Sequence, residues 1–191
     1  MKIAVFCASS PKVPEKYFEA ARRVSAALVK AGYGIIYGGG AVGLMGAVAD
    51  EVLKLDGSIT GIIPRFMVDA EWEHKDVEDM IHVETMHKRK ELMVHGSSGI
   101  VALPGGTGTL EELFEVLSLK KLGQYSHPIV VLNTDGFYNG LLQQTRKMVE
   151  ERFMRPVHNE MWSIVDRPED VVPAIENAKP WDKNSINFAA V

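Results

Sequence analysis

The residues with the clearest chemical potential stand in one run, Leu103-Pro104-Gly105-Gly106-Thr107-Gly108-Thr109-Leu110-Glu111-Glu112. An apolar stretch, 100–103, predicts a strand that breaks at a proline and two glycines and then opens into a helix. The free backbone N–H groups and the dipole at such a helix start favour a bound phosphate. Two carboxylates, Glu111 and Glu112, follow in the first turn. Negative charges next to a bound phosphate repel it, so their presence calls for a functional explanation. Chemistry on a sugar phosphate would supply that explanation.

Glu112 is the candidate catalytic carboxylate. It stands about one turn into the predicted helix, where the dipole should keep it ionised. An ionised carboxylate can hold ribose hydroxyls, stabilise a cationic sugar or orient an attacking water. The alternative is that Glu111 and Glu112 only complement the helix dipole. Thr107 and Thr109 add hydroxyls that can cap the helix or bond to phosphate oxygens.

A second run, Met86-His87-Lys88-Arg89-Lys90, places four potentially cationic side chains in a chain that is acidic overall. Arg89 does not readily give up its proton, so it suits a phosphate anchor or an electrostatic partner of a leaving group better than a general base. A solvated basic helix face is the alternative explanation of such a run.

With Gly38-Gly39-Gly40 and Gly43-Leu44-Met45-Gly46, these two runs resemble the Lonely Guy family of cytokinin riboside 5′-monophosphate phosphoribohydrolases. The chain satisfies PGGxGTxxE through Glu112 and MHxRK from Met86 to Lys90, and the match spans nearly the whole chain in the right order. The resemblance implies hydrolysis of the N-glycosidic bond of adenine-type nucleoside 5′-monophosphates to free base and ribose 5-phosphate. It makes Arg89 and Glu112 the catalytic pair.

The resemblance also implies a set of substrate-binding residues. They are Met86, Arg89, Lys90, Gly105, Gly106, Thr107, Gly108, Thr109, Leu110 and Glu111. Ser118 joins them because it keeps a hydroxyl in a stretch where many members carry Thr-Trp, and the missing tryptophan leaves the base preference open. Small residues after the first two predicted strands give further candidate phosphate or nucleotide contacts, namely Ser9, Gly39, Gly40, Gly43 and Met45. Tight strand-to-helix turns are the alternative explanation of these glycines.

These residues need a scaffold, and the hydrophobic pattern predicts one. Short apolar runs alternate with longer amphipathic ones, which is typical of βαβ units around a mostly parallel sheet. We expect an α/β, Rossmann-like, doubly wound sheet flanked by helices, with residues 1–179 as one nucleotide-binding domain and 180–191 as a flexible tail. The predicted strands are 3–7, 35–37, 58–63, 81–83, 99–103, 128–132 and 162–165. The acidic segment 65–80, with Trp72 and His74, predicts a long loop or short irregular helix that could act as a lid.

The composition of the chain limits the kinds of molecule that it is expected to bind. Lysine and arginine number 21 against 25 aspartates and glutamates, a formal charge of −4, so there is no global electrostatic reason to bind nucleic acid or an anionic membrane. No apolar run approaches the roughly 20 residues of a membrane-spanning helix. One cysteine, Cys7, and no secretory signal predict a cytoplasmic protein. The histidines lack metal-ligand spacing, so we expect neither metal nor cofactor. A homodimer is expected from the resemblance alone.

Three other functions are alternatives to hydrolysis. A non-catalytic nucleotide-binding or carrier protein on the same fold would retain its ligand without releasing base. A lysine decarboxylase would need pyridoxal phosphate on a lysine, and no Schiff-base lysine is identifiable. A dinucleotide-dependent dehydrogenase is disfavoured because the glycine cluster follows the second predicted strand instead of the first, and no acidic residue is placed to hold an adenosine ribose.

Overall fold

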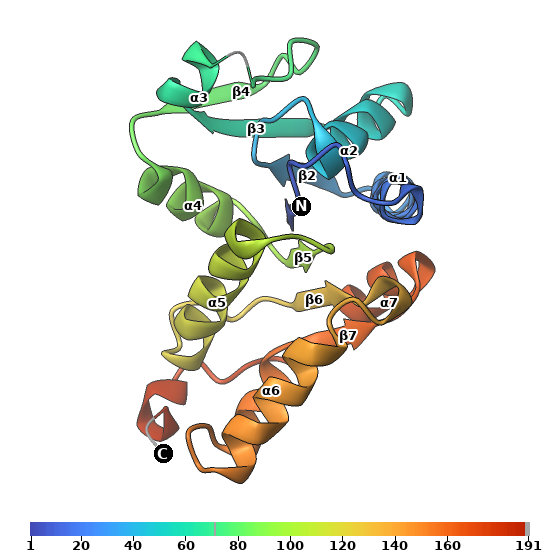
Figure 1. The fold of residues 1–191 in the computed structure, drawn as a ribbon. Helices are drawn as coiled ribbons and strands as arrows, with labels where there is room; N and C mark the ends of the chain where they lie inside the picture. Colours follow the sequence, from blue (N-terminus) through green and yellow to red (C-terminus); the bar gives the residue numbers. More distant parts are fainter. Residues whose placement is uncertain (71, 190–191) are drawn as a thin grey trace.

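A seven-stranded parallel sheet forms the centre of the molecule (Figure 1). The computed structural model describes residues 1–70 and 72–189. The strand order is β4-β3-β2-β1-β5-β6-β7, and each neighbouring pair runs parallel. The strands are β1 Lys2–Phe6, β2 Gly34–Tyr37, β3 Ile59–Pro64, β4 Met80–Val83, β5 Ile100–Ala102, β6 Ile129–Leu132 and β7 Ser163–Val165. The predicted α/β class and the doubly wound parallel sheet are confirmed.

Helices cover both faces of the sheet. One face carries α1 Glu15–Lys30, α2 Gly43–Lys54 and α7 Val171–Glu176, and the other carries α4 Met86–His95, α5 Thr107–Lys121 and α6 Asn139–Glu150 (Figure 1). The central strand β1 supplies both cores, because successive side chains of a strand point to opposite faces. Ile3 and Val5 enter the core under α1 and α2, whereas Ala4 and Phe6 enter the core under α4 and α5. Among the described helices, none has the length and apolar character needed to cross a membrane.

The path of the chain creates the place for a ligand. From β1 the chain moves outward through β2 and β3 to β4, and α4 then returns it to β5 on the other side of β1. The connections after β1 and β5 therefore lead to opposite faces of the sheet. In open α/β sheets this switch point opens a crevice beyond the carboxyl ends of the strands.

The segment after β3 combines a short helix, α3 Arg65–Asp69, with a stretch held by backbone hydrogen bonds. The N–H of Ala41 donates to the carbonyl of Trp72 (2.9 Å), and the N–H of His74 donates to the carbonyl of Gly39 (3.0 Å). Between them, Gly40 and Glu73 form an isolated antiparallel bridge. Trp72 is thereby attached to the glycine turn that follows β2.

The C-terminal segment, which the sequence predicts as a tail from residue 180, contacts the end of α5. Trp181 Nε1 and the Ser185 hydroxyl both donate to the carbonyl of Lys120 near the end of α5, at 2.7 and 3.1 Å. A 3-10 helix follows at Ser185–Phe188. The last carbonyls of a helix lack intrahelical donors, so this segment satisfies one of them. Single anchoring side chains leave no periodic pattern in the sequence. Residues 190–191 of the predicted tail lie outside the described residues.

Candidate active site

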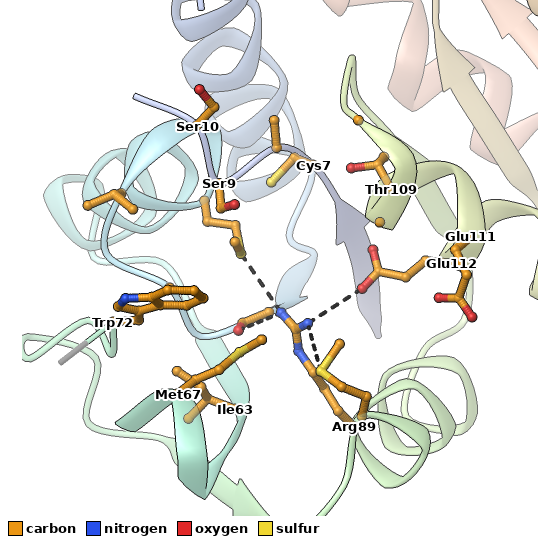
Figure 2. Close-up of a pocket in the computed structure, with 18 of the residues that line it drawn as sticks. Cys7, Ser9, Ser10, Ile63, Met67, Trp72, Arg89, Thr109, Glu111 and Glu112 are labelled. Atoms are coloured by element: carbon orange, nitrogen blue, oxygen red, sulfur yellow. Dashed lines mark hydrogen bonds and ion pairs between the residues drawn. The ribbon is translucent and has the colours of Figure 1, made fainter. Parts of the chain in front are cut away.

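A cavity of about 380 Å³ opens at the carboxyl edge of the sheet (Figure 2). Five parts of the chain enclose it: the connections after β1, β2 and β3, one side of α4, and the start of α5. Most of the residues predicted for the site meet here. They are Ser9, Gly40, Met45, Met86, Arg89, Gly106, Thr107, Gly108, Thr109, Glu111 and Glu112.

Arg89 is a fixed, buried cation in the wall of this cavity. It is only 6% exposed. Its Nε donates to the carbonyl of Ile62 (3.0 Å) and its Nη2 to the carbonyl of Gly38 (2.7 Å). Both carbonyls stand near the ends of strands, and a Cβ on Gly38 would overlap the guanidinium. The close approach of backbone and arginine therefore requires glycine at position 38.

The helix that carries Arg89 begins at a defined place. Thr85 caps α4, and its hydroxyl accepts a hydrogen bond from the N–H of Lys88 (3.1 Å). Such a cap satisfies one of the free donors of the first turn and fixes where the helix starts. Arg89 then lies one turn into the helix, directed at the ends of β2 and β3.

Glu112 faces Arg89 from the first part of α5. Its Oε1 lies 3.7 Å from Arg89 Nη1, and both side chains are largely buried (Figure 2). Burial raises the pKa of Glu112 to about 7, although the Arg89 charge acts in the opposite direction. This differs from the expectation that the helix dipole would keep the group ionised, because burial favours the neutral form more strongly. Glu112 can therefore exchange a proton near neutral pH.

The start of α5 offers donors for an anion. The first helical hydrogen bond runs from the N–H of Leu110 to the carbonyl of Gly106 (3.0 Å), so the N–H groups of Thr107, Gly108 and Thr109 precede it. No side chain caps this end of the helix. Backbone amides at a helix start, reinforced by the dipole, form a phosphate-binding arrangement.

Lys90 does not line the cavity, in contrast to its neighbour Arg89. Its ammonium makes ion pairs with Glu111 and with Glu115, the second at 2.9 Å. Those hydrogen bonds raise the pKa of Lys90 although its partial burial opposes the shift. Lys90 thus forms a bridge between α4 and α5, and its contact with substrate stays a prediction.

Five further predicted residues also lie outside the cavity lining: Gly39, Gly43, Gly105, Leu110 and Ser118. Gly43 has a φ of +66° and packs against the backbone of Ser9, so its contribution is to the shape of the turn. Leu110 packs against the apolar core under α5. The Ser118 hydroxyl donates to the carbonyl of Phe114 (2.8 Å), and the residue lines a separate groove beside the 3-10 helix Pro156–Met161.

Other cavity residues were not predicted as contacts. Ile63, Met67 and Trp72 form an apolar side opposite Glu112 (Figure 2). The only sequence signal for Trp72 was an aromatic residue in an acidic segment without periodicity, and Ile63 and Met67 gave none beyond the end of a strand. Cys7 also lines the cavity, and burial raises the pKa of its thiol, which keeps the group protonated. Across the residues that the structure describes, no group of three or more acidic, histidine or cysteine side chains is placed to hold a metal.

The chain is similar in sequence to several known proteins. A family model described as "possible lysine decarboxylase" matches residues 45–175. The cytokinin riboside 5′-monophosphate phosphoribohydrolase LOG5 of Arabidopsis thaliana is 38% identical over 179 residues, which cover 94% of this chain and 78% of the relative. LOG3 of the same plant is 38% identical over 199 residues, covering 99% and 93%. The probable phosphoribohydrolase LOGL2 of Oryza sativa subsp. japonica is 37% identical over 186 residues, covering 97% and 76%.

Solved structures share the fold. A molybdenum cofactor binding protein from Rippkaea orientalis superposes with a TM-score of 0.69 at 22% identity, covering 92% of this chain and 95% of that one. The molybdenum cofactor carrier protein of Chlamydomonas reinhardtii superposes with a TM-score of 0.67 at 18% identity, covering 93% and 98%. At these identities the likeness establishes the architecture alone.

Proposed function

This chain belongs to the Lonely Guy family of cytokinin riboside 5′-monophosphate phosphoribohydrolases, and from that premise we propose that it hydrolyses the N-glycosidic bond of adenine-type nucleoside 5′-monophosphates. The products are the free base and ribose 5-phosphate. The observation that carries the proposal is the buried pair Arg89 and Glu112, 3.7 Å apart, in a cavity whose wall includes a helix start suited to phosphate.

The positions of these groups support a separate place in the cavity for the phosphate, the ribose and the base. The backbone amides of Thr107, Gly108 and Thr109 hold the 5′-phosphate at the start of α5. Glu112 follows one turn later, so the ribose lies near its carboxylate. The base then extends toward Arg89 and the apolar side formed by Ile63, Met67 and Trp72.

The reaction needs stabilisation of a ribosyl cation and a proton for the departing base. As the bond from C1′ to the base nitrogen breaks, positive charge develops on the sugar, as in glycoside hydrolysis. The Glu112 carboxylate stabilises that charge and orients a water molecule. The oxygen of this water bonds to C1′, and one of its protons is transferred to the departing base. Arg89 stabilises the negative charge that gathers on the departing base, and its two carbonyl bonds keep it in place for that role.

A pyridoxal phosphate enzyme, which the name of the family model suggests, does not fit this cavity. Such an enzyme binds its cofactor through a lysine amine. The cavity lining among the described residues contains no lysine, and the adjacent Lys90 is engaged by Glu111 and Glu115. We therefore assign no cofactor-dependent step.

The homodimer remains part of the proposal. The groove lined by Phe114, Met148 and Met154 gives an apolar surface beside α5. Phe153, which precedes Met154 in the sequence, is 77% exposed. Sedimentation velocity over a tenfold range of concentration tests this: a monomer throughout would contradict it.

Product analysis with a panel of nucleotides tests the proposed reaction. AMP, N6-isopentenyl-AMP, GMP and CMP are incubated with the protein, and the free bases and ribose 5-phosphate are separated by chromatography. We expect base release from the two adenine nucleotides, with their ratio of kcat/KM giving the preference, and a large loss in Arg89→Met. Binding of AMP without release of adenine would instead favour the carrier function.

A further inference from the structure

Tyr138 immediately precedes α6 and lies outside the lining of the cavity. The residue is 2% exposed, and its hydroxyl donates to the carbonyl of Leu103 at 2.7 Å. Leu103 is itself fully buried and immediately precedes Pro104-Gly105. Its carbonyl therefore stands at the point where the chain leaves β5 and enters the phosphate turn.

The same phenol oxygen contacts the other side of the turn. Burial raises the pKa of Tyr138, and the nearby backbone of Gly105 acts in the opposite direction. Tyr138 thus donates to the residue before Pro104 and lies near the backbone of the residue after it. Proline has no N–H to donate, so the hydrogen bond to the Leu103 carbonyl is the contact that ties this turn to the Tyr138 side chain.

Tyr138 is positioned by a second set of contacts. Its own N–H donates to Asn133 Oδ1 (2.7 Å), and Asn133 Nδ2 donates to Asn139 Oδ1 (3.0 Å) and Asp166 Oδ1 (3.1 Å). The ring of Phe137 packs edge-on against the Tyr138 ring, with centroids 4.9 Å apart. The ends of β6 and β7 therefore support the turn that follows β5.

We propose that Tyr138 is a positioning residue for phosphate binding: its hydroxyl holds the backbone of 103–105 so that the amides of Thr107 to Thr109 are aimed into the cavity. The inference rests on the proposed function in assigning phosphate to this turn. Tyr138 touches neither the sugar nor the base, so its effect is confined to the phosphate end of the ligand. It therefore adds a contributor that the motif residues themselves do not include.

The test compares ligands with and without the phosphate. In Tyr138→Phe the ring stays and the hydrogen bond to the Leu103 carbonyl is lost, and we expect the Kd for ribose 5-phosphate, measured by titration calorimetry, to rise about tenfold. The Kd for adenosine should change by less than about twofold. In turnover, KM for AMP should rise by the same factor while kcat is kept.

Tyr125→Phe is the matched control, because this buried tyrosine has its hydroxyl 3.4 Å from Ser97, away from the cavity. It should leave both Kd values unchanged. Amide hydrogen exchange gives a readout that needs no ligand: Tyr138→Phe should speed exchange at Gly105 to Thr109 relative to the remainder of α5.

Three results would overturn the inference. They are an unchanged Kd for ribose 5-phosphate in Tyr138→Phe, an equal loss for adenosine, and unaltered exchange in the turn. A wild-type protein that binds ribose 5-phosphate without cleaving AMP refutes the proposed hydrolysis and still allows this comparison. A wild-type protein that does not bind ribose 5-phosphate would refute the phosphate assignment and the role of Tyr138 with it.

Discussion

Gly38 directly follows β2 at a place where the backbone leaves room for Arg89, and adding one methyl group there tests the position of the arginine. The Cβ of Gly38→Ala would overlap Arg89 Nη2 and would lie 2.9 Å from both Arg89 Cζ and Met45 Sδ. The guanidinium must then give up its 2.7 Å bond to the Gly38 carbonyl and shift relative to Glu112. A hydrogen bond from a charged group contributes about 1.5–3 kcal/mol, and misplacing a reacting group by about 1 Å can cost about 100-fold in rate.

We therefore expect Gly38→Ala to lower kcat/KM for AMP by about 100-fold, with a loss of about 1–3 kcal/mol in the free energy of unfolding. Release of adenine followed by chromatography measures the first, and urea denaturation measures the second. Gly140→Ala is the control for the substitution itself, because a Cβ on this α6 residue meets nothing within 4 Å. It should keep full activity.

A double-mutant cycle separates the arginine from other consequences of the methyl group. If Gly38→Ala acts through Arg89, adding it to Arg89→Met should cause little further loss of kcat/KM, since effects of contacting residues are not additive. A further 100-fold loss in the double variant, or full activity in Gly38→Ala alone, would refute this reasoning.

Three more substitutions probe the cavity and the ion pairs beside it. Folding raises the pKa of Glu112 from 4.5 to about 7, so ionisation of this group lowers the stability of the folded protein as the pH rises through this range. Glu112→Gln should therefore raise the free energy of unfolding, measured by urea denaturation, by up to about 3 kcal/mol at pH 8 and should not change it below pH 4.5. An equal gain at both pH values would contradict the assignment. Trp72→Ala removes an aromatic wall and should raise KM for AMP about two- to tenfold, with kcat/KM unchanged as the opposing outcome. Lys90→Gln should leave KM for AMP within about threefold, because its ammonium is engaged by Glu111 and Glu115, whereas a tenfold rise in steady-state assays would indicate direct contact with substrate.

The fold was accessible from the sequence because its elements carry strong local signals. All seven predicted strands overlap the strands of the structure, the switch from short apolar runs to amphipathic ones marks α1 and α2, and the proline and glycines before Thr107 mark the start of α5. The helix boundaries are less accessible: α6 spans Asn139–Glu150. Its start is displaced by Asp135 and Gly136, which adopt positive φ angles in the 3-10 turn Thr134–Gly136.

The candidate site was partly accessible. The motif residues lead to the convergence of Arg89 and Glu112, and the structure brings those two together. The protonation of Glu112 was not accessible, because burial depends on which distant segments cover it. The partners of Lys90 could not be predicted from the sequence either, because its contacts with Glu111 and Glu115 depend on how α4 lies against α5. The apolar side at Trp72 depends on hydrogen bonds between segments that are about 30 residues apart in sequence.

One measurement addresses the central claim, that the Arg89 and Glu112 pair cleaves the N-glycosidic bond with water. Excess protein is mixed with AMP without added inorganic phosphate, the mixture is quenched over time, and adenine, ribose 5-phosphate and AMP are quantified. We predict one adenine and one ribose 5-phosphate for each AMP lost with the wild type, and intact bound AMP with Glu112→Gln. Intact AMP recovered from a wild-type protein that binds it would contradict the account, as would undiminished turnover by Glu112→Gln.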